Sequence, residues 1–302
     1  MATINTNMSA NVAANSLTRN ERSMAATMER LSTGIRINSA KDDAAGLAIT
    51  SKMTSQINGL NQAVRNANDA ISMIQVGEGA LKEVTNMLQR MRELAIQASS
   101  DSNTDADRTA LNNEFTQLRD EISRIAANTQ WNGTAIFAQT AAVSDKVFQV
   151  GSNASQTITV SFKNFDAGTT TNTANNSGDA TANSSFAALD VDGGSNTKNI
   201  ENLAITSRTG SNEAMFAMSA AIEAVNSQRA LLGASMSRLE FASDNLQNVA
   251  QNSAAARSRV LDADYAAETT ELARTQIIQQ AGTAMLSQAN QSQQSILALL
   301  QS

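Results

Sequence analysis

Histidine, cysteine and proline are all missing from this chain of 302 residues. Without imidazole or thiolate groups, the chain cannot build a Cys–His nucleophile, a Ser–His–Asp triad, a zincin motif or a thiolate or imidazole metal site. Carboxylate acid–base chemistry stays possible in principle, but the Asp and Glu residues are spread along predicted helical faces. We therefore expect no catalytic residue, no metal site and no cofactor, and we predict that the protein is not an enzyme.

The missing proline also predicts long helices, because proline breaks helix interiors and about 15 prolines would be present at ordinary usage. Only 3% of the residues are aromatic and 17% are charged. The net charge is −6 and no basic block occurs, so nucleic acid and anionic membranes are poor partners. No apolar run approaches the roughly 20 residues that span a bilayer. Residues 1–10 lack a basic and an apolar region, so we expect a dedicated machine if the protein is exported.

Apolar residues recur at steps of three and four along both ends of the chain, which is typical of coiled-coil-like helices. After a break at residues 34–40, the pattern predicts a long helix over residues 43–99. A capping box formed by Thr104 and Asp107 then starts a helix that should fold back antiparallel. The last helix is expected over residues 262–302, and residues 275–302 contain no charged side chain but eight glutamines.

The middle of the chain has a different pattern. Asn132-Gly133 indicates a turn, and Ile158, Val160 and Phe162 alternate with polar residues, as in a strand whose partner is expected at residues 147–150. Residues 166–199 are rich in Thr, Asn, Ser, Gly and Ala and resemble an exposed insertion. The sequence thus predicts a mainly α fold: a long antiparallel coiled-coil-like rod with a small β-hairpin, a central insertion, and paired N- and C-terminal helices.

The two terminal helices have a narrow apolar stripe, which we call the terminal seam. Alone, these helices bury too little apolar surface to offset the cost of ordering their backbone, at roughly 1–2 kcal/mol per residue. We therefore expect them to be disordered in the monomer, to order on assembly and to drive polymerisation. The terminal seam consists of Leu17, Met24, Met28, Leu31, Ile35, Ile277, Ile278, Ala281, Met285, Ile296, Leu299 and Leu300.

Several long motifs resemble those of bacterial flagellins. The run ERLSTGIRINSAKDDAAGLAI at residues 29–49 is similar to the N-terminal signature of that family, as are RNANDAIS at 65–72, GEGAL at 77–81 and LQRMRELA at 88–95. The run QIIQQAGTAMLSQAN at residues 276–290 is similar to the C-terminal signature. The resemblance covers roughly residues 1–165 and 200–302.

This resemblance implies a subunit that polymerises into the extracellular filament of the bacterial flagellum and serves swimming motility. Residues 1–40 with 263–302 would form the inner tube of the filament. Residues 41–165 with 200–262 would form the helical rod and hairpin of the outer tube, and residues 166–199 a short solvent-facing insertion. The implied partners are further copies of the chain, the flagellar cap and hook-associated proteins, and an export chaperone on the C-terminal helix.

The resemblance also implies a surface recognised by a Toll-like receptor of a host, at Arg90, Leu94 and Glu114. These residues are equally compatible with ordinary helix packing or with subunit contacts. Two other interpretations remain open. The chain could be a hook–filament junction protein with the same helical ends, or its Thr/Asn/Ser-rich insertion could act as an adhesin or carry O-linked glycans.

Overall fold

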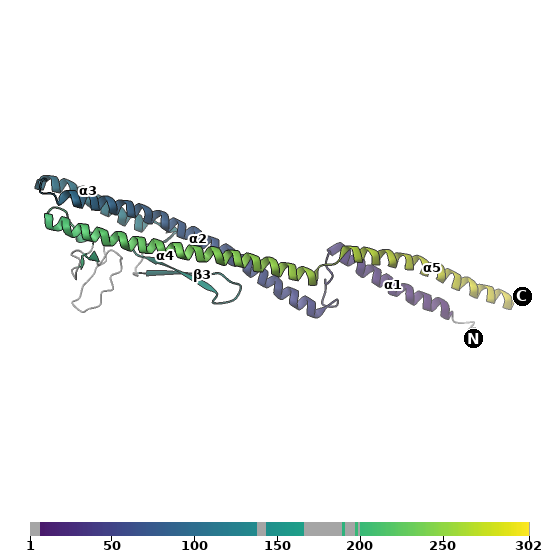
Figure 1. The fold of residues 1–302 in the computed structure, drawn as a ribbon. Helices are drawn as coiled ribbons and strands as arrows, with labels where there is room; N and C mark the ends of the chain where they lie inside the picture. The colour runs from purple at the N-terminus through teal and green to yellow at the C-terminus, as the bar shows by residue number, and fades with distance from the viewer. Residues whose placement is uncertain (1–6, 138–142, 166–188, 191–196, 199, 302) are drawn as a thin grey trace. The chain divides into compact units, whose positions relative to one another are not determined.

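The computed structural model describes residues 7–137, 143–165, 189–190, 197–198 and 200–301, with no side-chain description beyond residue 291. Five α-helices and three short antiparallel strand pairs make up this part of the chain (Figure 1). None of its helices is both long and apolar enough to cross a membrane. The mainly α fold with a small β-hairpin is confirmed. The helices are α1 (Met8–Thr33), α2 (Ala44–Ala98), α3 (Asp105–Asn128), α4 (Arg208–Leu261) and α5 (Tyr265–Gln301).

The predicted helix ends agree with the local geometry. Helix α1 ends at Gly34, whose φ of 70° lies in the left-handed region that glycine adopts without strain. Helix α3 begins with the predicted capping box, in which Thr104 and Asp107 satisfy one another's backbone amides. Hydrogen bonds from the Thr104 hydroxyl and backbone lower the pKa of the Asp107 carboxyl. The turn at Asn132-Gly133 has positive φ at both residues and joins β1 (Gln130–Trp131) to β2 (Thr134–Ala135).

The chain divides into two compact units. Unit 1 comprises Met1–Asn58 and Ala250–Ser302, and unit 2 comprises Gly59–Val249. The boundaries between them fall within α2 and α4, because each of these helices continues from one unit into the other. These units are defined by how compactly the chain packs, so they do not test the predicted division into inner tube, outer tube and insertion.

Unit 2 has a continuous apolar core between α2, α3 and α4. The residues that the three–four pattern predicts to face inward are largely the ones that are buried. They include Ala67, Ile74, Leu81, Val84, Leu88, Met91 and Ala95 of α2, Phe115 and Ile122 of α3, and Met218, Val225, Leu232 and Leu239 of α4. Figure 1 shows α3 lying back along α2, as the short connection at residues 99–104 predicted. Burial of these core residues supplies the main stabilisation of unit 2.

A β-hairpin packs on this core. Strand β3 (Val143–Gln149) pairs antiparallel with β4 (Thr157–Lys163), and Phe148 lies opposite Ile158. In β4 the residues Ile158, Val160 and Phe162 are buried and the alternate residues are exposed, as the period of two predicted. A Cβ placed on Gly77 of α2 would lie 3.3 Å from the rings of both Phe137 and Phe162. Glycine therefore lets this part of the hairpin approach the helix closely.

The predicted insertion at residues 166–199 lies almost wholly outside the described residues. Within it, β5 (Leu189–Asp190) pairs with β6 (Thr197–Lys198). A 3₁₀ turn at Ile200–Asn202 then leads toward α4.

Candidate assembly surface

Helices α1 and α5, both in unit 1, form an antiparallel pair that polar contacts hold in register. The Asn20 side-chain amide donates a 2.7 Å hydrogen bond to the carbonyl oxygen of Thr275. Arg30 pairs with Glu268 through Nη1 and Oε1 at 3.3 Å. Near the start of α1, the Asn7 side-chain amide donates a 3.2 Å hydrogen bond to the carbonyl oxygen of Ala289. The contacts run in opposite directions along the two sequences, as an antiparallel arrangement requires.

Backbone hydrogen bonds close the other end of this pair. The amide of Arg36 donates to the carbonyl of Leu261 at 2.7 Å, and the amide of Ala263 donates to the carbonyl of Gly34 at 3.0 Å. Ile35 and Asp262 thereby form an isolated antiparallel bridge. The segments that follow α1 and precede α5 are therefore fixed to each other, which aligns the two helices at this end.

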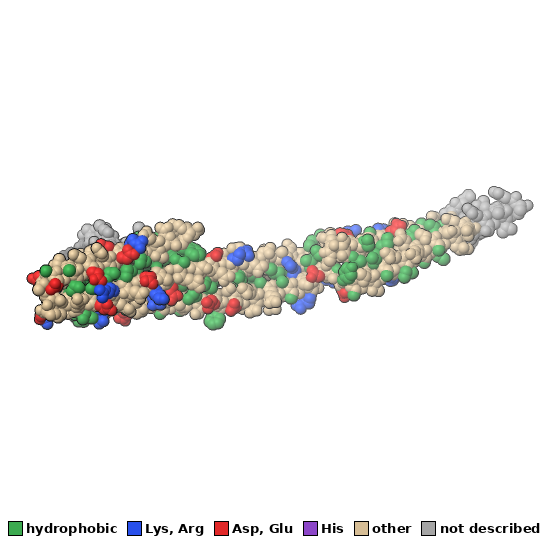
Figure 2. Space-filling view, turned by 90° about the horizontal axis from the view of Figure 1, so that it is seen from above, with side chains coloured by type: hydrophobic (Ala, Val, Ile, Leu, Met, Phe, Trp, Pro, Cys, Tyr) green, Lys and Arg blue, Asp and Glu red, His purple; other side chains and the backbone are tan. Residues whose placement is uncertain are grey.

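The α1/α5 pair buries polar groups and leaves its apolar groups accessible. Among the described side chains of these helices, the buried ones are Asn20, Thr27 and Thr275. By contrast, Met8 and Val12 are each 61% exposed, Ile277 is 66% exposed and Met285 is 65% exposed. Figure 2 shows apolar side chains gathered on the visible face of this pair. Two helices with a narrow stripe cannot enclose that stripe by themselves, so its burial requires another surface.

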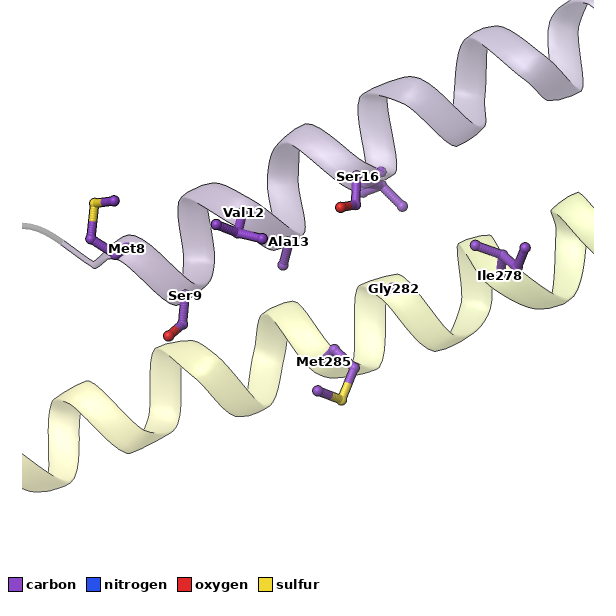
Figure 3. Close-up of a pocket in the computed structure, with 9 residues that line it drawn as sticks. Met8, Ser9, Val12, Ala13, Ser16, Ile278, Gly282 and Met285 are labelled. Atoms are coloured by element: carbon purple, nitrogen blue, oxygen red, sulfur yellow. The ribbon is translucent and has the colours of Figure 1, made fainter.

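The accessible apolar groups surround a groove of about 530 Å³ between α1 and α5, shown in Figure 3. Gly282 lies on the α5 side, where an added Cβ would be 3.3 Å from Leu17. The small residue thus lets the two helices approach at this point. The groove is lined by Met8, Ser9, Val12, Ala13, Ser16, Leu17, Ile278, Gly282 and Met285.

Charged side chains are missing from both walls of this groove. The sequence carries no charged side chain before Arg19, and none follows Arg274. Sequence reasoning considered the uncharged C-terminal stretch but missed its N-terminal counterpart, and with it Met8 and Val12. The signal that could have identified them is the charge-free run of residues 1–18, which matches the run at the other end of the chain.

The structure places the predicted terminal seam as follows. Leu17, Met24, Leu31 and Ile35 are half-buried, and Met28 is exposed. On α5 the residues Ile277, Ile278, Ala281 and Met285 are exposed. Ile296, Leu299 and Leu300 belong to α5, but their side chains lie outside the described part of the chain. Among these residues the groove brings together Leu17, Ile278 and Met285.

The second predicted surface lies in unit 2, on α2 and α3. Arg90 and Glu114 are 49% and 46% exposed and form an ion pair at 3.0 Å, and Arg90 also pairs with Glu93 at 3.2 Å. The carboxylate of Glu114, with that of Glu93, raises the pKa of the Arg90 guanidinium. Leu94 is different: it is fully buried in the core of unit 2. Its side chain supports helix packing and offers no surface to a partner while unit 2 is folded.

Comparison with known proteins identifies the family to which these helices belong. Residues 4–142 match the bacterial flagellin N-terminal helical region, and residues 215–300 match the corresponding C-terminal helical region. A flagellin of Halalkalibacterium halodurans is 43% identical over 273 residues, which cover 90% of each chain. The chain belongs to the bacterial flagellin family. It is accordingly a structural subunit of a flagellar filament.

A second flagellin matches nearly the whole chain, and a flagellin of known structure matches part of it. A flagellin of Bacillus subtilis is 41% identical over 308 residues, covering 98% of this chain and 99% of its own. A crystal structure of Bacillus cereus flagellin is 28% identical and covers 64% of this chain and 94% of that one, with a TM-score of 0.44. The sequence matches include both terminal helical regions, and the α1/α5 groove is therefore built from family regions at both ends of the chain.

Proposed function

We propose that the chain polymerises outside the cell into the filament that drives swimming, and that the α1/α5 groove and the terminal seam around it form the polymerisation surface. The observation that carries this proposal is an accessible apolar groove whose walls carry no charge. The occupant is a second copy of the chain, because a filament subunit must bind its own kind. A head-to-tail contact of this type repeats without closing and generates a helix.

The segments then have separate roles in the filament. Residues 1–40 with 263–302 would form the inner tube. Residues 41–165 with 200–262 would form the outer tube, and residues 166–199 the solvent-facing insertion. The large apolar core of unit 2 supports its role as the part that is stable before assembly. The polar interior of the α1/α5 pair supports the expectation that this pair becomes ordered only when copies associate.

The exposed apolar groups on α5 also support the proposal that other proteins bind this helix. Before assembly, Ile277, Ile278 and Met285 face water on a helix stretch without charge, which favours aggregation. An export chaperone that covers the C-terminal helix would prevent this. At the growing end and the base of the filament, the flagellar cap and hook-associated proteins would take the place of a neighbouring copy.

The test is electron microscopy of the purified chain with filament seeds, beside a variant that lacks residues 263–302. We expect long filaments from the full chain and none from the shortened one, because the variant loses α5. Hydrogen exchange of the free monomer should show less protection in α1 and α5 than in the α2 and α4 segments of unit 2. Protected terminal helices in the monomer would contradict ordering on assembly. A full chain that stays monomeric with seeds would favour the hook–filament junction protein instead.

A second proposed function is recognition by a Toll-like receptor of a host through Arg90 and Glu114. Both side chains are half-exposed and hold complementary charge at a fixed place on unit 2. Such a pair can donate and accept hydrogen bonds across a protein interface. Leu94 would act through the core that positions α2, since its own side chain is buried.

We expect Arg90→Ala to weaken receptor activation about tenfold, as loss of an arginine anchor does at many interfaces. The same variant should also assemble less well, because this surface is expected to meet other subunits. Receptor signalling is measured in reporter cells with purified monomer. The matched control is Arg124→Ala, which removes another exposed ion pair, with Glu121, from α3. Unchanged signalling by Arg90→Ala would remove the assignment.

A further inference from the structure

Two methionines from opposite ends of the sequence line the α1/α5 groove. Met8 comes from α1 and Met285 from α5 (Figure 3), and these residues are 61% and 65% exposed in the free chain. Met91 and Met218 of unit 2, by comparison, are fully buried. Susceptibility of a methionine to oxidation follows its accessibility. The groove therefore presents two oxidisable sulfur atoms on the surface that polymerisation would bury.

We propose that Met8 and Met285 form a reversible oxidation site that switches off assembly of the free chain. The oxidant is hydrogen peroxide. The thioether sulfur attacks one peroxide oxygen, the O–O bond breaks and an S–O bond forms. Sulfur loses two electrons and becomes a sulfoxide, and the proton of the transferred oxygen passes to the departing hydroxide, which leaves as water. The proposal rests on the polymerisation surface proposed above and gives that surface a chemical control.

The physical reason is that a sulfoxide is strongly polar whereas a thioether is not. Val12, Ala13, Leu17 and Ile278 give the groove a predominantly apolar wall, and neither helix brings a charged side chain to it. Packing another copy against the groove would remove the sulfoxide oxygen from water without a matched donor, which costs free energy. Oxidation of a methionine-rich contact is therefore expected to weaken it, and reduction to restore it.

The first arm of the test treats the full-length monomer with hydrogen peroxide and maps oxidised residues by peptide mass spectrometry. We expect oxidation at Met8 and Met285 and none at Met91 or Met218 before unfolding. With filament seeds, the lowest protein concentration that supports growth should rise at least about tenfold. Methionine sulfoxide reductases acting on both epimers should return it to the untreated value. If the untreated chain grows filaments and the completely oxidised chain grows equally well, this inference is overturned, while the proposed polymerisation surface is not contradicted.

The second arm uses matched variants. Met8→Leu with Met285→Leu removes both sulfur atoms and keeps the apolar volume. Growth of this double variant is compared with its own untreated growth, and peroxide should change it far less than it changes growth of the original chain. Met53→Leu removes a half-buried methionine of α2 that belongs to neither the groove nor the terminal seam, so this variant should stay peroxide-sensitive. If Met53→Leu abolished the peroxide effect, or if the double variant stayed as sensitive as the original chain, the effect would belong to a different site and the proposal would be overturned.

A third arm compares preformed filaments with monomer. If neighbouring copies fill the groove, Met8 and Met285 should oxidise at least about tenfold more slowly in the filament. Equal rates in monomer and filament would show that the groove stays open after assembly, which would overturn the proposal. Growth of untreated protein is measured in parallel, so a failure to polymerise at all is recognised separately as a failure of the proposed function.

Discussion

Replacing Met285 by glutamate is expected to stop filament elongation while unit 2 stays folded. The side chain lies on α5 in a groove whose lining residues carry no charge, and it is mostly exposed in the free chain. In the monomer a carboxylate there remains in water and costs little. In the filament it would have to lose its hydration without an opposite charge nearby, and that penalty is several kcal/mol. We expect elongation from seeds to slow at least about a hundredfold.

Elongation is measured by light scattering and electron microscopy, and the folding of unit 2 by circular dichroism and thermal unfolding. Met285→Leu is the control, because it conserves apolar volume and should elongate nearly as well as the original chain. Normal elongation of Met285→Glu at ordinary protein concentration would show that this side of the groove stays in water in the filament. The polymerisation surface would then have to lie elsewhere on the terminal helices.

The second large effect is expected in the hairpin of unit 2, where Phe162→Ala should lower the free energy of unfolding by about 3–5 kcal/mol. Phe162 is buried, and its ring meets that of Phe137 edge to face at 6.1 Å. Phe137 also meets Phe165 in the same manner at 5.9 Å. Removing the Phe162 ring leaves a cavity beneath the hairpin and breaks an aromatic contact, and both losses add to the cost.

Urea unfolding of the monomer can be followed by fluorescence, because the single tryptophan, Trp131, belongs to unit 2 and lies partly buried beside this core. Phe241→Ala is the matched control. That phenylalanine on α4 is 76% exposed, so its removal should change the free energy of unfolding by no more than about 0.5 kcal/mol. A change below about 1 kcal/mol for Phe162→Ala would mean that the hairpin contributes little to the stability of unit 2.

Much of the fold could be predicted because its signals are local. The spacing of Leu81 and Leu88 identifies one helix face, the Thr104 and Asp107 pair identifies a helix start, and Asn132-Gly133 identifies a turn. Each of these depends on residues within one turn or one heptad. The alternation in β4 is equally local, and the register with β3 follows once the partner strand is known.

What the periodicity could not predict is which surface covers a given apolar face. Leu17 of α1 follows the same three–four spacing as Leu88 of α2, yet Leu88 is fully buried and Leu17 only partly. The difference is the number of neighbours: α2 packs with α3, α4 and a hairpin, whereas α1 has α5 alongside it. A stripe in a sequence indicates a buried face without saying whether the same chain or another copy buries it.

The burial of Leu94 could have been predicted from its position in the helix. It stands three residues after Met91, which occupies the inward seam of α2, so helical geometry alone places it toward the core. Arg90 and Glu114 are different, because their ion pair joins separate helices. Their meeting depends on the register between α2 and α3, and the sequence specifies that register only through the length of the connection.

The polar contacts inside the α1/α5 pair have a consequence for the geometry of a polymer. Asn7, Asn20 and Arg30 each bind a particular position on the facing helix, at Ala289, Thr275 and Glu268. Sliding one helix past the other would break these contacts together, while the exposed apolar stripe would tolerate the shift. Buried polar groups can fix register at little gain in affinity. In every copy, the apolar groups of α1 and α5 therefore lie at the same positions relative to each other. A helical lattice of equivalent subunits needs each copy to present the same surface to the next.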